Sequence, residues 1–235
     1  MLARPIRKVR VTDLRHSSMD YAAARQNMVD CQILPNRVTN PYIVDGMLDL
    51  PREKFVPVEL VGVAYLDGSL PLGSGRFLME PMLVARLLEV VAPDSDDVAM
   101  VVGCASGYLS ALLAKIVSTV VAVESDKAFT LCAGESFKQL SIDNVVLVEC
   151  ELNDGCSKQC PYDVIVFDGA VAEIPDAIIE QLANGGRLAA VVMGKDGIGR
   201  AQMLSRHGDT ISSRNMFEAG TPLLPGFEDE TKFSF

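Results

Sequence analysis

The chain has 235 residues, of which 49% are hydrophobic, and it carries a formal net charge of −10. This length allows one large α/β domain or a domain with an extension, and the apolar content is enough to bury a sizeable core. The negative charge argues against binding to nucleic acid, whose phosphates a protein neutralises with basic residues. No apolar run approaches the roughly 20 residues of a membrane-spanning helix, and we find no secretory signal. We therefore expect a cytoplasmic protein without nucleic-acid or membrane partners.

The first 18 residues form the one basic segment, with five Lys or Arg and one Asp. The segment has no clear apolar periodicity, so we interpret it as a poorly ordered tail or a leader before Met19. A targeting sequence or a contact arm are the alternatives.

Residues 20–92 predict a helical extension. A helix is expected over residues 20–34, ending before Pro35, and a second helix begins at Asn40-Pro41. Residues 64–81, rich in Gly and Pro, are predicted to form an extended loop, and loops of this length are often functional. An apolar-faced helix follows over residues 81–92.

From residue 98, buried apolar runs alternate with helical stretches. The runs cover 98–103, 119–125, 144–150, 163–170 and 187–193, and the helical stretches cover 108–116, 127–140 and 174–186. This alternation predicts an α/β fold with a doubly wound, mostly parallel, Rossmann-like sheet. Residues 201–219 predict a terminal β-hairpin with a Gly-Asp turn at 208–209. We divide the chain into a tail (1–18), a helical extension with a substrate-side loop (19–92) and an α/β core (93–235).

Glycines and acids follow the predicted strands, where doubly wound sheets bind their ligands. A turn with Gly103 and Gly107 follows the first strand, and Glu124 ends the second strand about twenty residues later, where a carboxylate can accept hydrogen bonds from a ribose diol. Glu151, after the third strand, is placed to read an adenine amino group. Because Ala105 takes the middle position of the turn, a pyrophosphate would approach the backbone poorly, which favours S-adenosylmethionine over a dinucleotide.

Asp168 and the cysteines leave alternatives open. Asp168, at the end of the fourth strand, either faces the methyl acceptor or bonds the following turn, and we favour the turn. None of the six cysteines forms a Cys-x-x-Cys pair, so we expect reduced thiols and no metal site.

Several stretches resemble the protein-L-isoaspartate O-methyltransferase family: "PREKFVP", "AYLDGSLPLGSG", "EPMLVARLLE", "GCASGYLSALLA", "VAVE", "PYDVIVFDGA" and "IPDAIIEQLANGGRLAAVV". The resemblance runs in order from about residue 20 to residue 193. It implies a class I methyltransferase fold, S-adenosylmethionine as cofactor, and methylation of the α-carboxylate that isoaspartyl residues expose in damaged proteins or peptides.

The resemblance also implies the site residues. We expect cofactor-binding roles for Gly103, Cys104, Ala105, Gly107, Tyr108, Glu124, Ser125, Glu151, Leu152 and Asp168, with Gly155 matching a glycine just beyond. We expect substrate-binding roles for Leu70, Pro71, Leu72, Leu78, Met79, Glu80 and Pro81. Asp168 and Glu80 are the candidate catalytic residues.

Three positions depart from the family. Val101 stands where the family has an acid, Ala105 replaces a glycine, and Met79 replaces the active-site serine. Because a substrate carboxylate is ionised at neutral pH, no general base is needed and activity can survive these changes. Glu80 either repels such a carboxylate or caps the helix at Pro81 while Met79 packs. A decayed homologue that binds without catalysis, or a methyltransferase for another acceptor, are the alternatives.

Overall fold

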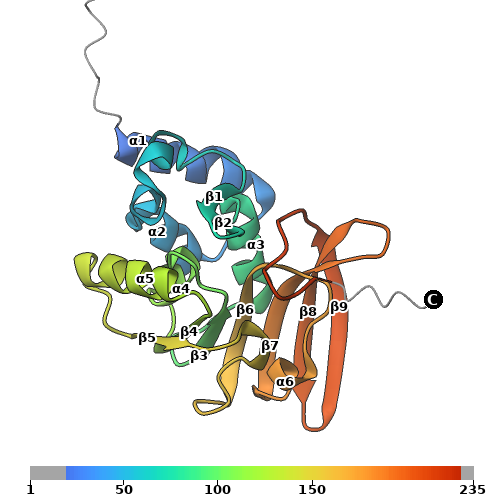
Figure 1. The fold of residues 1–235 in the computed structure, drawn as a ribbon. Helices are drawn as coiled ribbons and strands as arrows, with labels where there is room; N and C mark the ends of the chain where they lie inside the picture. Colours follow the sequence, from blue (N-terminus) through green and yellow to red (C-terminus); the bar gives the residue numbers. More distant parts are fainter. Residues whose placement is uncertain (1–19, 229–235) are drawn as a thin grey trace, which may run out of the picture.

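The computed structural model describes residues 20–228. Its centre is a seven-stranded sheet in the order β5-β4-β3-β6-β7-β8-β9 (Figure 1). The strands are β3 (Val98–Val102), β4 (Thr119–Glu124), β5 (Val145–Glu149), β6 (Tyr162–Val171), β7 (Leu182–Met193), β8 (Gly199–His207) and β9 (Thr210–Glu218). Because β4 and β6 flank β3 on opposite sides, the strand order reverses between β3 and β6, and ligands of doubly wound sheets bind at such a reversal.

The parallel half of the sheet follows from its buried apolar runs. β3 pairs in parallel with β4 and with β6, and successive β3 residues face two different core clusters: Val101 packs in one and Met100 in the other. This alternation is the period of a strand that is covered on both faces. The predicted α/β class and mostly parallel sheet are confirmed.

The antiparallel half contains the predicted terminal hairpin. β8 pairs antiparallel with β7 and with β9, and the pair His207↔Thr210 closes the turn at 208–209. Because β9 ends the sheet, most of its residues are exposed.

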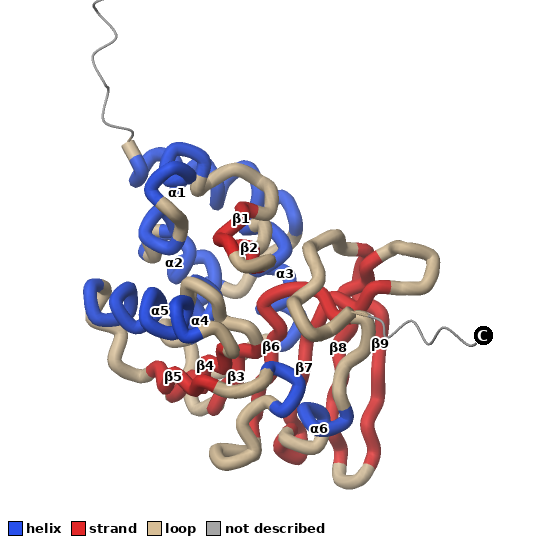
Figure 2. Tube along the Cα trace, in the orientation of Figure 1, coloured by secondary structure: helices blue, strands red, loops and turns tan. Residues whose placement is uncertain are grey.

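The helices lie mostly on one side of the sheet (Figure 2). They are α1 (Tyr21–Met28), α2 (Pro41–Asp49), α3 (Pro81–Val91), α4 (Tyr108–Leu113) and α5 (Lys127–Gln139), and α1 continues through a π-helical turn to Ile33. α2 packs against α3 and α4, and α3 packs against β6, β7 and β8. None of the helices in the described range 20–228 is long and apolar enough to cross a membrane.

Two predictions of local structure are wrong. The helix expected over residues 174–186 is limited to α6 (Asp176–Ile179), and β7 begins at Leu182 because that residue pairs with Tyr162 of β6. The loop over residues 64–81 contains a short hairpin of β1 (Leu70–Gly73) and β2 (Arg76–Leu78). Ser74 and Gly75 both have positive φ, as a tight two-residue hairpin turn requires.

After β9, a final segment (residues 220–228) returns across the sheet to β6 (dark red in Figure 1). The N–H of Ala170 donates to the Pro222 carbonyl at 2.9 Å, and the N–H of Leu224 donates to the Ala170 carbonyl at 2.8 Å. Ala172 donates to the Phe227 carbonyl at 3.0 Å. These bonds fix the segment over the end of β6, next to the point where the strand order reverses.

Candidate active site

The glycine turn after β3 is held by backbone hydrogen bonds. The N–H groups of Gly103 and Cys104 both donate to the Val123 carbonyl, at 2.9 and 3.0 Å, and Gly107 donates to the Cys104 carbonyl at 2.8 Å. Gly103 and Gly107 have φ values of 78° and 94°. These values lie in the left-handed region that favours glycine.

Ala105 also adopts the left-handed region, with φ of 45°. A residue with a Cβ pays about 1–2 kcal/mol there. The N–H of Ala105 donates to Oε2 of Glu124 at 2.7 Å, which holds the turn in this conformation despite the strain.

Glu124 is completely buried at the end of β4. Besides Ala105, its carboxylate accepts hydrogen bonds from the N–H groups of Ser125 and Asp126, at 2.9 and 3.1 Å. Its position against the glycine turn is the one that the sequence predicts for a ribose-binding acid.

The fourth partner of Glu124 is Arg76 of β2, which the sequence analysis did not identify. Nη1 of Arg76 lies 2.8 Å from Oε1 of Glu124, and Nη2 donates to the Gly103 carbonyl. Only 3% of Arg76 is exposed. A single basic residue in the apolar stretch "RFLM" was the available signal, but it does not reveal a partner 48 residues away.

Leu224 lies against the backbone of Gly169 in β6 and of Gly103 after β3. A Cβ added to Gly169 would lie 2.7 Å from the Leu224 side chain, and one added to Gly103 would lie 2.7 Å from Nη2 of Arg76. The backbone at both strand ends is therefore covered by these two side chains.

The cavity left at this point has a volume of about 10 Å³. Its walls come from Gly75, Arg76, Phe77, Met79, Asp168, Gly169, Thr221, Pro222, Leu223 and Leu224. A volume near 10–15 Å³ admits about one water molecule, whereas ligand pockets commonly span about 300–1,000 Å³. Neither Glu124 nor the glycine turn lines this small cavity, which lies between β2, the end of β6 and the segment after β9.

Asp168 lies in the same cavity wall and is 4% exposed. Burial raises its pKa to about 7, although the positive charges of Arg76 and Arg52 act in the opposite direction. The bond to the following turn that we favoured is wrong: within residues 20–228, no hydrogen bond of the Asp168 carboxyl group is found.

The substrate-side loop is mostly part of the core. Four of its predicted substrate-binding residues are buried: Leu70, Leu78, Met79 and Pro81. Leu72 is partly exposed and Pro71 is exposed. That Met79 packs, one of our two readings, agrees with its exposure of 1%.

Glu80 and Arg52 fix the end of this loop. Glu80 takes the N-cap position of α3, as predicted, but its side chain makes no capping hydrogen bond; Oε1 instead accepts a hydrogen bond from the Ser69 hydroxyl at 2.8 Å. The buried Arg52 donates to the carbonyls of Ala64 and Met79, at 2.7 and 2.5 Å. Its guanidinium also lies 4.7 Å from the centre of the Tyr108 ring.

The other predicted cofactor residues divide into two groups. Glu151 and Ser125 are exposed at the rim, beside the buried Leu152 and Gly155. Cys104 and Tyr108 form the buried group. Burial raises the pKa of the Cys104 thiol. Tyr108 is buried against Phe55, with ring centres 5.4 Å apart. The side chain of Tyr108 therefore packs under the N-terminal helices, and only its backbone belongs to the glycine turn.

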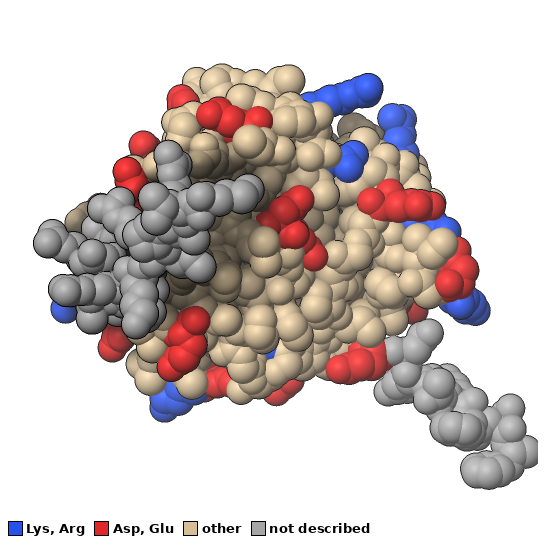
Figure 3. All heavy atoms as spheres, turned by 90° about the horizontal axis from the view of Figure 1, so that it is seen from above, with Lys and Arg blue, Asp and Glu red and all other residues tan. Residues whose placement is uncertain are grey.

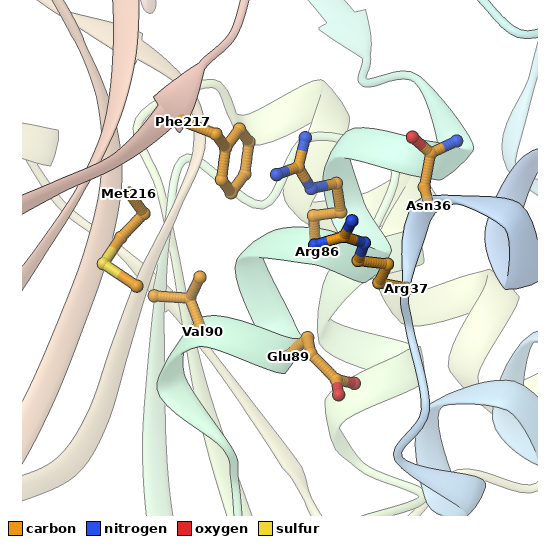
Figure 4. Close-up of a pocket in the computed structure, with 7 residues that line it drawn as sticks. All are labelled: Asn36, Arg37, Arg86, Glu89, Val90, Met216 and Phe217. Carbon is orange, nitrogen blue, oxygen red and sulfur yellow. The ribbon is translucent and has the colours of Figure 1, made fainter.

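A larger cavity of about 320 Å³ lies elsewhere, between α3 and β9 (Figure 4). Its lining contains none of the predicted site residues. The Arg86 guanidinium stacks 3.5 Å from the centre of the Phe217 ring, and the Glu89 carboxylate accepts bonds from Thr39 and from the Asn40 N–H. These contacts connect α3 to its neighbours and bring no catalytic groups together.

Among the described residues, no cluster of three or more metal-ligating side chains occurs.

Comparison with known proteins identifies the family. The family model of protein-L-isoaspartate(D-aspartate) O-methyltransferase (PCMT) matches residues 23–219. The chain belongs to this family. The protein-L-isoaspartate O-methyltransferase of Pelotomaculum thermopropionicum is 33% identical over 171 residues, which cover 73% of this chain and 75% of that relative.

Two solved structures support the same fold. A protein-L-isoaspartate O-methyltransferase superposes with a TM-score of 0.77 at 23% identity, covering 86% of this chain and 66% of that one. A Plasmodium falciparum beta-aspartate methyltransferase (PCMT) in complex with S-adenosyl-L-homocysteine gives a TM-score of 0.73 at 19% identity, covering 87% of this chain and 97% of that one. The resemblance to the PCMT family and its class I methyltransferase fold is confirmed.

Proposed function

We propose that this chain is an S-adenosylmethionine-dependent O-methyltransferase that methylates the carboxylate of isoaspartyl residues in damaged proteins or peptides. The observation that carries the proposal is the PCMT match over residues 23–219, in which Glu124 lies buried against the glycine turn. An acid at the end of the second strand, about twenty residues after the glycine turn, is where a doubly wound sheet binds a ribose.

The reaction does not require a side chain of the protein to act as a general base. A substrate carboxylate with an ordinary pKa near 4 is ionised at neutral pH, so it attacks without a general base. The protein's part is to position the acceptor and to exclude water. The replacement of the family's serine by Met79 removes a positioning hydroxyl, which is typically worth about 0.5–1.5 kcal/mol net.

The surface and the thiols support a protein or peptide substrate in the cytoplasm. Asp and Glu are spread over the face seen from above, and Lys and Arg lie toward its margin (Figure 3). Such a surface disfavours nucleic acid as the acceptor. All six cysteines are free, as is usual in a reducing compartment.

One observation favours a second candidate, a family member that has lost the chemistry. Arg76 binds the Glu124 carboxylate and the Gly103 carbonyl, and the family residues at 79, 101 and 105 are replaced. A methyltransferase for a different acceptor is the third candidate.

Labelled methyl transfer tests the proposal. S-adenosylmethionine with a labelled methyl group is incubated with two matched peptides, one with isoaspartate and one with ordinary aspartate. We expect label in the isoaspartyl peptide alone. Calorimetry with S-adenosylhomocysteine on the same sample separates the candidates: binding without transfer indicates another acceptor, and neither binding nor transfer refutes the proposal in favour of the second candidate.

A further inference from the structure

The Arg76–Glu124 ion pair lies where the proposed cofactor would bind. Nη1 of Arg76 is 2.8 Å from Oε1 of Glu124, and both residues are almost completely buried. We propose that Arg76 competes with the cofactor ribose for the Glu124 carboxylate and so sets the affinity of this chain for S-adenosylmethionine. This inference rests on the proposed function, because it concerns the same site.

The hydrogen bonds at the site favour the arrangement in which Arg76 is paired with Glu124. The two Glu124 oxygens accept from Arg76 and from three backbone N–H groups. Arg76 also donates to the Gly103 carbonyl at the end of β3. A ribose would offer two hydroxyl donors, whose bonds to the carboxylate are also charge-assisted, but it would bring no positive charge. At Glu124 the cofactor must therefore replace a buried ion pair with uncharged donors.

Displacing Arg76 also leaves its charge to be accommodated. A buried ion that loses its partner is costly unless it reaches water or another anion. Asp168 is the other carboxyl group beside Arg76 and Arg52, and its pKa is raised to about 7 by burial. Because Asp168 is only partly ionised near neutral pH, it is a weaker partner for the displaced guanidinium than Glu124.

Leu224 provides a second, independent obstruction. It reaches the site from the segment after β9, and the bonds of Pro222 and Leu224 with Ala170 hold it there at 2.9 and 2.8 Å. Its side chain would lie 3.0 Å from a Cβ placed on Gly103. Because Leu224 does not contact Glu124 through any hydrogen bond, removing it should enlarge the cavity without releasing the carboxylate.

Binding of S-adenosylhomocysteine, measured by calorimetry, tests the competition without relying on activity. We compare the wild type with Arg76→Gln, Leu224→Ala and the double variant. Arg187→Gln is the control, because it also removes an Arg–carboxylate pair, here a partly buried one with 2.6 Å between Arg187 and Asp97. That pair lies at the opposite end of β3, just before Val98. Urea unfolding of each variant confirms that it is folded.

We expect Arg76→Gln to bind S-adenosylhomocysteine at least tenfold more tightly than the wild type, and Arg187→Gln to bind within twofold of the wild type. Leu224→Ala should give a smaller gain, and the double variant the largest. Equal affinities of the wild type and Arg76→Gln would overturn the competition and leave the proposed function standing. If even the double variant, shown to be folded, does not bind, both proposals fail. Should Arg76→Gln not fold, an unchanged affinity of Arg76→Lys, which cannot bridge Glu124 and Gly103 with two nitrogens, would also overturn it.

Discussion

The carboxyl group of Asp168 gives a stability prediction with a defined pH dependence. Burial raises its pKa from 3.8 to about 7. Below pH 4 the group is protonated in both the folded and the unfolded chain, so it costs nothing. As the pH rises from 4 to 7, the unfolded chain ionises while the folded chain keeps its proton, and the free energy of unfolding therefore falls. Above pH 7 the full cost of the buried charge persists.

The magnitude follows from the two pKa values. The cost to the folded state is about 1.6 kcal/mol at pH 5 and about 4 kcal/mol at pH 8. Asp168→Asn removes the titrating group. The free energy of unfolding of the variant, relative to that of the wild type, should therefore be about 2–3 kcal/mol higher at pH 8 than at pH 5.

Urea unfolding followed by circular dichroism at pH 5 and pH 8 measures this change. Asp196→Asn is the control, because hydrogen bonds from Arg200 and the Ile198 N–H lower the pKa of Asp196 to about 2. That group is ionised at both pH values, so the difference between this variant and the wild type should not change between them. An Asp168→Asn difference that is also equal at pH 5 and pH 8 would show that the buried carboxyl is not protonated in the folded protein, and would refute the reasoning.

Three further variants test the structure around the site. Ala105→Gly relieves a left-handed alanine and should raise the free energy of unfolding by about 1 kcal/mol, measured in urea; a loss of stability would contradict the strain at this turn. Met79→Ser restores the family's serine but empties a buried position, and should cost about 2–4 kcal/mol and lower the melting temperature; an unchanged melting temperature would show that Met79 is not tightly packed. Arg52→Met removes the donors to Ala64 and Met79, so limited proteolysis should cleave residues 64–81 faster, whereas the control Arg200→Gln, at a half-buried arginine elsewhere, should leave that rate unchanged.

The sequence was informative where one strong signal decided the structure. The apolar runs at 98–102 and 119–124 have no stable place except inside a covered parallel sheet, and their acids and glycines then fall at known ends of strands. The prediction was wrong for residues 174–186, where helix-forming residues up to Gln181 suggested a long helix. The pairing of Leu182 with Tyr162 decides that segment, and tertiary pairing overrides local propensity.

The positions of Arg76 and Leu224 at the strand ends could not be predicted from the spacing of residues in the sequence. Arg76 meets Glu124 only after the short hairpin, folded at Ser74 and Gly75, points β2 toward the end of β4. Leu224 reaches the same point from the other end of the chain. Motifs describe which residues stand at strand ends, but which distant side chains lie over them depends on the complete fold.

The segment over residues 220–228 also bears on the order in which the molecule assembles. Its hydrogen bonds to Ala170 and Ala172 join it to the end of β6, although β7, β8 and β9 separate the segment from β6 in the sequence. Because chains emerge from the ribosome N-terminus first, β3 and β6 can pair while Leu224 has not yet been synthesised. A nascent chain would thus pass through a stage in which the sheet is built and the ends of β3 and β6 are still uncovered on the Leu224 side. Ligand added during synthesis, rather than to the finished protein, would meet the more open of the two forms.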